Sequence, residues 1–177
     1  MTVAERTEIV STIRDWVEKE VMPVASELEH ADEYPAELVA QMKELGLFGV
    51  IIDEEYGGLG LDLTTYALVQ IELSRGWMSL SGLLNTHFLS AWMIQTHGTE
   101  EQRRRYLPRM ATGEARSAYS MTEPHAGSDV QAIRTVARRD GDHYVVNGSK
   151  MFITNGRHGN CFALLAKTDP SAEPPHR

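Results

Sequence analysis

Two short segments of the chain carry residue types that together could hold a flat ring with polar edges. Residues 118–129 read AYSMTEPHAGSD, and residues 150–156 read KMFITNG. The first segment is rich in hydroxyl groups, which belong to Tyr119, Ser120, Thr122 and Ser128. Gly127 permits the close backbone approach that the polar edge of a bound ligand often requires. In the second segment, alternation along a strand would place Phe152 and Thr154 on one face, where one side chain stacks on a ring and the other hydrogen-bonds its edge.

These features match the needs of a flavin ring. Reduced flavin carries negative charge on its pyrimidine side, so donors placed there stabilise it, while its accepting nitrogen must stay open to the substrate. Thr122 and Thr154 suit those edges. The alternative interpretation is that Tyr119, Met121 and Phe152 are apolar positions in the core of strands. Each of these three residues taken alone favours that alternative, whereas the combined pattern favours flavin contact.

Two carboxylates in the first segment invite a catalytic interpretation. Glu123 and Asp129 stand six residues apart and could in principle act as acid and base. We assign them structural roles instead. Glu123 precedes Pro124 in a loop, where its carboxylate can accept backbone N–H groups, and Asp129 can cap the turn after Ser128.

The histidines and the cysteine do not predict a metal site. The metal-binding pattern H-E-x-x-H is absent. None of the following histidines has a metal-binding spacing: His87, His97, His125, His143 and His158. We expect each of them to lie at the surface or to have its hydrogen bonds satisfied. His125 differs in lying inside the first segment, where it is placed to touch a cofactor or a neighbouring subunit. The single cysteine, Cys161, is expected to be a small buried hydrophobe, with a reactive thiol as the alternative.

Composition narrows the class of protein. A chain of 177 residues with 42% hydrophobic residues suits one or two domains with an ordinary core. The formal net charge of −8 argues against nucleic-acid binding, and the basic run 103–105 follows two glutamates on a helix, as on a solvated face. No run of eighteen apolar residues appears, and the first ten residues are charged, so we expect a cytoplasmic protein with no membrane association.

The first 113 residues predict helices. Apolar residues recur at spacings of three and four and predict a helix that Pro23 interrupts or kinks. They are Ile9, Ile13, Trp16, Val17 and Val21. A second helix should start at Pro35 and stop at Gly46. The segment 47–53 is a helical turn or an extended link to the glycine-rich loop 57–60, which we interpret as a turn because it lacks the spacing of a dinucleotide fingerprint.

Three further helices are expected before Gly113. One spans 62–75, with Asp62 as N-cap and Gly76 beyond its end. The next, 79–97, is apolar or small on nearly all sides, which indicates a central, buried helix that lines a cavity. The last begins with the capping box of Thr99 and Gln102.

After Gly113 the chain predicts strands. Residues 135–139 and 143–147 flank a hairpin turn, a strand at 151–154 follows a second turn signal, and 161–167 is another strand. These strands are too few to close a barrel, and the final PSAEPPHR is a polar, proline-rich loop. The fold class predicted is therefore α+β and multidomain: an all-α helical bundle over 1–113, followed over 114–177 by the first strands of an incomplete β-barrel domain.

Four motifs in this order resemble those of one family. They are YGGLGLD at 56–62, GTEEQRRRYLP at 98–108, TEPHAGSD at 122–129 and NGSKMFITNG at 147–156. The chain resembles the acyl-CoA dehydrogenases, flavoproteins that insert a trans double bond between the α and β carbons of acyl-coenzyme A thioesters. The resemblance covers essentially all 177 residues. Because members of the family are more than twice as long, we expect this chain to correspond to the amino-terminal domain and part of the middle domain.

The resemblance implies FAD as cofactor and assigns site residues. Tyr119, Met121 and Thr122 would border the isoalloxazine ring, and Phe152 and Thr154 would hold the opposite edge. Gly127 would also contact the cofactor. Ser128 would contact flavin phosphate or the substrate's pantetheine, and the acyl pocket would include Asn85 and Leu89. The family often has tryptophan where Phe152 stands, so stacking is kept but the indole N–H donor is lost.

The resemblance also implies partners and the place of the catalytic base. In the family the base is a glutamate of the C-terminal bundle, which no residue of this chain matches, so we expect little dehydrogenation from these 177 residues alone. Acyl-CoA, an electron-transfer flavoprotein or similar acceptor, and further copies in a tetramer or dimer are the implied partners. Two alternatives stay open: a short flavin- or acyl-CoA-binding or subunit-interaction module without activity, and a related flavin enzyme such as a flavin oxidase, a nitroalkane oxidase or an alkylation-response protein.

Overall fold

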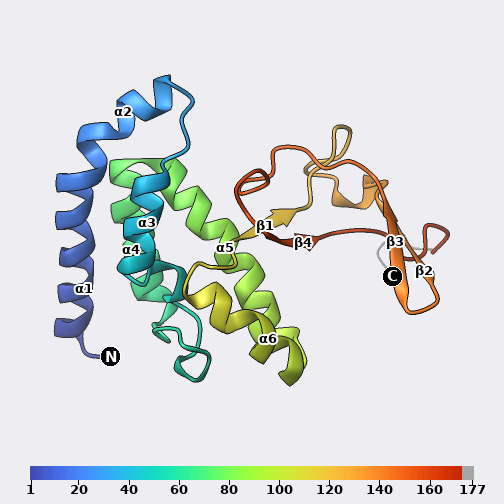
Figure 1. The fold of residues 1–177 in the computed structure, drawn as a ribbon, viewed down its shortest axis with the longest axis horizontal. Helices are drawn as coiled ribbons and strands as arrows, with labels where there is room; N and C mark the ends of the chain where they lie inside the picture. Colours follow the sequence, from blue (N-terminus) through green and yellow to red (C-terminus); the bar gives the residue numbers. More distant parts are fainter. Residues whose placement is uncertain (173–177) are drawn as a thin grey trace.

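The computed structural model describes residues 1–172, with a helical half and a strand-bearing half side by side (Figure 1). The helices are α1 (Val3–Trp16), α2 (Met22–His30), α3 (Ala36–Glu44), α4 (Leu63–Gly76), α5 (Met78–His97) and α6 (Glu100–Ala111). The strands are β1 (Ser117–Ser120), β2 (Val136–Asp140), β3 (His143–Asn147) and β4 (Cys161–Leu164). The predicted fold class is confirmed. Of the predicted C-terminal loop, residues 173–177 lie outside the described part.

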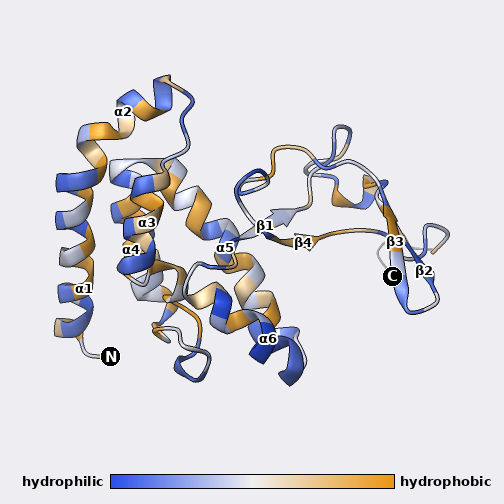
Figure 2. Ribbon diagram, viewed as in Figure 1, coloured by the Kyte–Doolittle hydropathy of each residue, from blue (hydrophilic) through white to orange (hydrophobic). Residues whose placement is uncertain are grey.

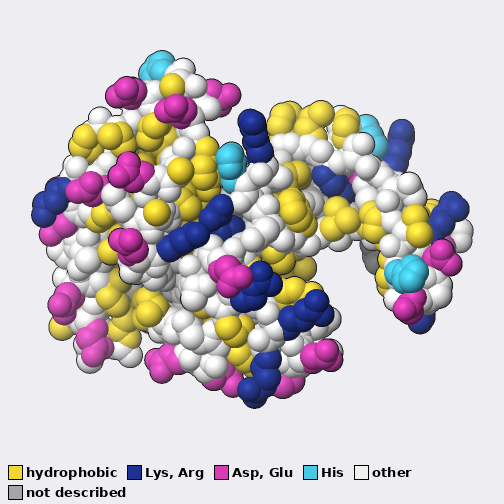
Figure 3. All heavy atoms as spheres, in the orientation of Figure 1, with side chains coloured by type: hydrophobic (Ala, Val, Ile, Leu, Met, Phe, Trp, Pro, Cys, Tyr) yellow, Lys and Arg dark blue, Asp and Glu magenta, His cyan; other side chains and the backbone are white. Residues whose placement is uncertain are grey.

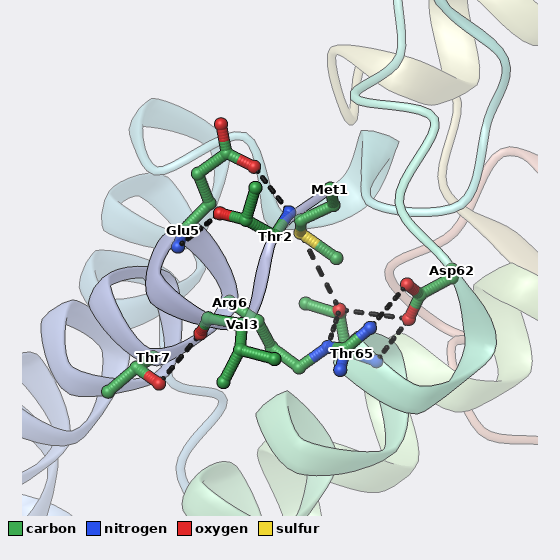
Figure 4. A network of polar contacts seen from close by, with 8 residues as sticks. All are labelled: Met1, Thr2, Val3, Glu5, Arg6, Thr7, Asp62 and Thr65. Atoms are coloured by element: carbon green, nitrogen blue, oxygen red, sulfur yellow. Dashed lines mark hydrogen bonds and ion pairs between the residues drawn. The ribbon is translucent and has the colours of Figure 1, made fainter.

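Helix α1 begins as its sequence dictates, with a capping box. Thr2 accepts the N–H of Glu5 at 3.2 Å, and the Glu5 carboxylate accepts the N–H of Thr2. Arg6 then joins α1 to α4 through an ion pair with Asp62 at 2.7 Å (Figure 4). Asp62 is the predicted N-cap of α4, since its carboxylate accepts the N–H of Thr65 at 2.8 Å.

The predicted interruption near Pro23 takes the form of a π-helical segment. Residues Val17–Val21 form this segment, and Pro23, which has no N–H to donate, follows in the first turn of α2. The axis of α2 turns away from that of α1 (Figure 1). The π segment places Val17 and Val21 against Gly76 of α4. A Cβ added to Gly76 would lie 2.5 Å from a methyl carbon of Val17. Gly76 is the last residue of α4, so the prediction that it lies beyond the helix end is wrong by one position.

The remaining helix boundaries follow their signals. Pro35 precedes α3, and Gly46 ends it with a left-handed φ of +70°. The segment after it is a turn of 3₁₀ helix, Leu47–Gly49, and Gly57 and Gly60 make the predicted turn with positive φ. Thr99 caps α6 in a box with Gln102, as predicted.

Two apolar clusters hold the helical half. The larger joins α1, the π segment, α3, α4 and α5, and the smaller lies between α5, α6 and the 52–56 turn. Helix α5 is central, but it is not buried on all sides, because Met78, Leu89, Trp92 and Met93 are exposed. It lines a cavity of about 500 Å³ beside α6 and β4. The basic run is solvated as predicted at Arg104, which pairs with Glu100 at 2.6 Å.

The strand-bearing half contains two separate pairs of strands. β1 and β4 are parallel, with Ser117 opposite Cys161, whereas β2 and β3 form the predicted hairpin around Gly141. Residue Lys167 links the pairs, since it exchanges backbone hydrogen bonds with Thr135 and Ala137 at 2.9 Å. Among residues 1–172, no helix has the length and apolar character needed to cross a membrane.

Three predictions about the strands and the cysteine of this half are wrong. Residues 151–154 form no strand, because Phe152 and Asn155 have φ of +57° and +64°, which breaks the extended backbone. β4 ends at Leu164 rather than at residue 167. Cys161 is only half-buried, since its strand is covered on one edge by β1 and lines the open cavity beside α5.

Candidate functional site

The two segments that could hold a ring lie side by side in the structure. The N–H of Met151 donates to the carbonyl oxygen of Thr122 at 2.9 Å. At the preceding position, the Lys150 ammonium donates to the carbonyl oxygen of Met121 at 2.9 Å. Residues 118–129 and 150–156 are therefore held in one fixed register, although the twenty residues 130–149 separate them along the chain.

Glu123 is the buried polar centre of this region. Its carboxylate accepts the N–H groups of Arg134 and Thr135 at 2.6 and 3.0 Å, which confirms the predicted structural role. It also pairs with Lys150 at 2.9 Å, and the two side chains are 1% and 9% exposed. Burial alone would raise the pKa of Glu123, but hydrogen bonds from Thr135, Arg134 and Lys150 outweigh burial and hold this pKa far below its usual range. Glu123 is thus a permanent anion and unsuited to proton transfer.

The loop after Glu123 is tight and open to solvent. Glu123 and Ala126 exchange backbone hydrogen bonds at 2.8 and 3.2 Å. Gly127 and Ser128 are exposed, and a Cβ placed on Gly127 would meet no atom within 4 Å, so a ligand can approach this backbone closely. His125 turns back to Glu123, with 3.4 Å between its Nε2 and the carboxylate. Its predicted contact with a cofactor or subunit stays a prediction.

The predicted turn cap at Asp129 is wrong. The side chain of Asp129 accepts no hydrogen bond from the short 3₁₀ helix Val130–Ala132. Its backbone carbonyl instead accepts the N–H of Ala132 at 3.1 Å, because the turn closes through the main chain.

The segment 151–160 is a loop in which most side chains are exposed. Phe152 is 87% exposed, and Thr154 is also exposed. Because Phe152 has a left-handed φ, the two do not share the face of a strand as predicted. Asn155 fixes the loop from below, since its buried amide donates to the carbonyl oxygens of Leu83 in α5 and Ser117 in β1 at 3.0 and 2.9 Å.

The two residues predicted for an acyl pocket lie one turn apart on α5. Asn85 and Leu89 are exposed, and spacing i,i+4 places them on one face of the helix. The amide oxygen of Asn85 accepts the Tyr66 hydroxyl at 2.7 Å. No hydrogen bond within residues 1–172 joins either residue to the 118–129 segment. Asn155 nevertheless ties α5 to the loop that carries Phe152, through Leu83.

A buried histidine connects the helical core to β1. His87 is fully buried, its Nε2 lies 3.2 Å from the carbonyl oxygen of Phe48, and its Nδ1 accepts the N–H of Ser117 at 3.3 Å. Burial lowers the pKa of His87 to about 4, so the ring is neutral. This confirms the prediction that His87 is a satisfied histidine. Within the described residues, no three His, Cys, Asp or Glu side chains gather in a way that could hold a metal ion.

Sequence reasoning did not single out Lys150 or Asn155. A signal existed for each: Lys150 is the one charge at the start of an otherwise apolar run, and Asn155 precedes Gly156, where left-handed backbone is common. Both residues were hidden by the expectation of a regular strand.

Comparison with known proteins gives consistent matches over the whole chain. Residues 4–114 match the family model "Acyl-CoA dehydrogenase, N-terminal domain", and residues 118–177 match "Acyl-CoA dehydrogenase, middle domain". The chain is 44% identical over 158 residues to the short-chain-specific acyl-CoA dehydrogenase of Clostridium acetobutylicum, an alignment that covers 89% of this chain and 42% of that protein.

Solved structures agree with the sequence matches. The acyl-CoA dehydrogenase of Geobacillus kaustophilus superposes with a TM-score of 0.88 at 39% identity, covering 97% of this chain and 45% of that one. The acyl-CoA dehydrogenase of Bacillus anthracis in complex with FAD gives 0.86 at 37% identity, covering 94% and 30%. The chain therefore spans less than half the length of these relatives.

Proposed function

The chain belongs to the acyl-CoA dehydrogenase family, and from this premise we propose that it supplies part of the flavin- and acyl-contacting surface of an FAD-dependent dehydrogenase acting on an acyl-CoA thioester. One observation carries the proposal. The segments 118–129 and 150–156, which contain the candidate flavin residues, are hydrogen-bonded together at residues 121–122 and 150–151. The similar Bacillus anthracis protein is an FAD complex.

The residues present fit a flavin. Within residues 1–172, neither the N–H nor the hydroxyl of Thr122 donates a hydrogen bond, so both are free for a ring edge. The aromatic face of Phe152 is open to solvent, which is unusual for so large an apolar side chain and suits stacking on a ring. Tyr119 and Met121, which lie close to Thr122 in the sequence, are half-buried and can offer an apolar border.

When bound, FAD accepts a hydride from the β-carbon of the substrate. Thr122 would donate to the ring edge that becomes negative on reduction, and Thr154 would donate to the opposite edge. Phe152 would stack and exclude water. Gly127 and Ser128, on the open loop, would admit and contact the phosphate or pantetheine portion, and Asn85 and Leu89 would border the acyl group.

We assign the catalytic base to none of these residues. Glu123 is committed to its hydrogen bonds, and its pKa is far too low for a base that works near neutral pH. We expect the base in the part of the family that this chain, at 42% of its relative's length, does not match. The 177-residue chain alone should therefore turn over acyl-CoA poorly. The same proposal includes a boundary between domains at residue 113, a cytoplasmic location, assembly as a homotetramer or dimer, and an electron-transfer flavoprotein or similar acceptor.

Flavin retention tests the proposal directly. The purified chain is incubated with FAD and passed through gel filtration while flavin absorbance is recorded, and affinity is then measured by flavin fluorescence. We expect bound flavin and at least tenfold weaker binding by Thr122→Val, about 1.4 kcal/mol. Thr64→Val is the matched control, because Thr64 is an exposed threonine at the start of α4. Equal affinity for both variants would remove Thr122 from the site, and rapid oxidation of an acyl-CoA by the chain alone would contradict the assignment of the base.

A further inference from the structure

The ion pair between Lys150 and Glu123 takes no part in the flavin contacts proposed above, yet it is the most buried pair of charges in the described structure. Its atoms are 2.9 Å apart, and the other eight ion pairs each include at least one side chain more than a third exposed. Taking two charges out of water costs free energy that their attraction repays only when further hydrogen bonds complete the geometry. A buried ion pair is thus weak evidence that the pair stabilises the fold. Its alternative role is to select one conformation of the chain.

The pair is completed by backbone groups from two separate segments. Glu123 accepts the N–H groups of Arg134 and Thr135, which lie just before β2. Lys150 donates to the carbonyl oxygen of Met121, which follows β1. Residues 121–122 and 150–151 lie outside the strands, so no strand pair joins these two stretches. The charges therefore supply the geometry that a sheet ladder supplies elsewhere.

The pair fixes one register in particular. The bond from Lys150 to Met121 lies next to the bond from the N–H of Met151 to the carbonyl oxygen of Thr122. These two adjacent hydrogen bonds hold residues 121–122 against 150–151, and Phe152 is the next residue in the chain. The two hydrogen bonds therefore lie directly beside Thr122, whose donors are free, and beside Phe152, whose ring is exposed.

We propose that Lys150, held by Glu123, is a positioning residue that fixes the spacing between Thr122 and Phe152 for the flavin ring. The inference rests on the proposed function for its purpose, but its structural core concerns the register of this chain alone. Without the ammonium of Lys150, the one hydrogen bond left to residues 150–152 within the described part of the chain runs from the N–H of Met151 to Thr122. The ring edge and the stacking face then no longer hold a constant separation.

Amide hydrogen exchange, followed by NMR on the 177-residue chain without flavin, separates positioning from general stability. Lys150→Met should speed exchange of the Met151 N–H at least tenfold. The N–H of Leu165, which donates to Ser120 at 3.0 Å beside β4, should change less than twofold and serves as an internal reference. Lys19→Met, which removes an exposed lysine of the π segment, should change neither amide. Equal acceleration at Met151 and Leu165, or none at Met151, would overturn the proposal.

A neutral double variant guards against simple unfolding. Lys150→Met leaves a buried carboxylate without its cation, which lowers stability by itself. Glu123→Gln combined with Lys150→Met removes both charges and should restore the melting temperature to within a few degrees, while the Met151 amide stays fast. Recovery of slow exchange at Met151 together with the melting temperature would show a purely structural role and contradict the proposal.

FAD binding provides the second readout. Lys150→Met and the double variant should both bind FAD at least tenfold more weakly than the original chain and shift the visible spectrum of any bound flavin. Undiminished affinity in the stable double variant would overturn the positioning role. If the original chain itself retains no FAD, the proposed function of these residues fails, whereas the exchange rates at Met151 and Leu165 still decide whether Lys150 fixes the register.

Discussion

The two halves of the molecule are held together by different kinds of contact. In the helical half, leucines, valines and aromatic rings fill two apolar clusters, and large side chains such as Phe48, Leu80 and Leu84 are fully buried. In residues 114–172, the buried apolar side chains are Ala115, Ala118, Ala126 and Ile133. Larger apolar side chains of this half, including Phe152 and Phe162, are exposed, and apolar surface is open along it in Figure 3.

Polar contacts take over where apolar burial is scarce. The register of the strand-bearing half depends on Glu123 and Asn155, which are buried, and on Lys150, which is partly buried. Each of them bonds to backbone groups. Figure 2 shows the same contrast along the ribbon: the helices alternate between apolar and polar faces, whereas the loops between β1 and β4 are mixed. The candidate site therefore lies where hydrogen bonds and an ion pair set the geometry. Such directional contacts specify position better than apolar contacts do.

The largest expected effect breaks the helical half. Leu84→Ala should lower the free energy of unfolding by about 3 kcal/mol, because Leu84 is fully buried and its loss leaves a cavity. Urea unfolding followed by far-UV circular dichroism measures the change. Leu63→Ala, at a position 66% exposed, is the control and should cost less than about 0.5 kcal/mol. Similar losses for both variants would contradict the cluster described for α5.

The next effect tests the link between the halves. Folded His87 has a pKa of about 4 because it is buried, against an ordinary value of 6.5. Between these values the unfolded chain binds more protons, so stability rises with pH. Unfolding free energy should fall by about 2 kcal/mol from pH 7 to pH 5 through this residue. His87→Gln should flatten that slope, while His143→Gln, at an exposed site, should leave it unchanged; an equal slope in all three proteins would exclude His87 as its source.

A smaller effect should be confined to the strand-bearing half. Asn155→Gly keeps the left-handed backbone but removes the bonds to Leu83 and Ser117, so we expect a loss of about 1–2 kcal/mol. Hydrogen exchange should quicken at the N–H of Gly156, which bonds to Ile153, and not in α1. Faster exchange throughout the helices would show that the two halves unfold as one unit.

The smallest effect concerns the solvated face of α6. Arg104→Ala removes the exposed pair with Glu100 and should cost only about 0.3 kcal/mol, since both side chains are more than half exposed. Thermal unfolding at low and high salt should show that this small difference disappears on screening. A loss above about 1 kcal/mol would mean that the basic run contributes to the core contacts of the helical half.

Sequence reasoning succeeded where structure is local. The caps at Asp62 and Thr99 and the stop at Gly46 are short-range signals, and each forms as predicted. The parallel partnership of β1 with β4 was not foreseen, because it joins residues 44 positions apart, such as Ser117 and Cys161, and no turn signal marks it.

In the candidate site, too, local features were predicted from the sequence and long-range contacts were not. The sequence identified the two segments, and the structure places them together at Thr122 and Met151. The expected strand at 151–154 failed, because alternation of apolar and polar residues does not reveal the positive φ of Phe152. Lys150 escaped notice because its role depends on Met121 and Glu123, which lie more than 25 residues earlier.

The open side of β4 has a consequence for handling the protein. One edge of β4 pairs with β1, and within residues 1–172 no strand pairs with the other. Phe162 and Leu164 lie along this strand and are 51% and 44% exposed. An unpaired strand with apolar side chains is a template for strand addition from another molecule. The concentration at which the chain remains monodisperse should therefore be governed by these few residues of β4, rather than by the net charge of −8 that otherwise keeps copies apart.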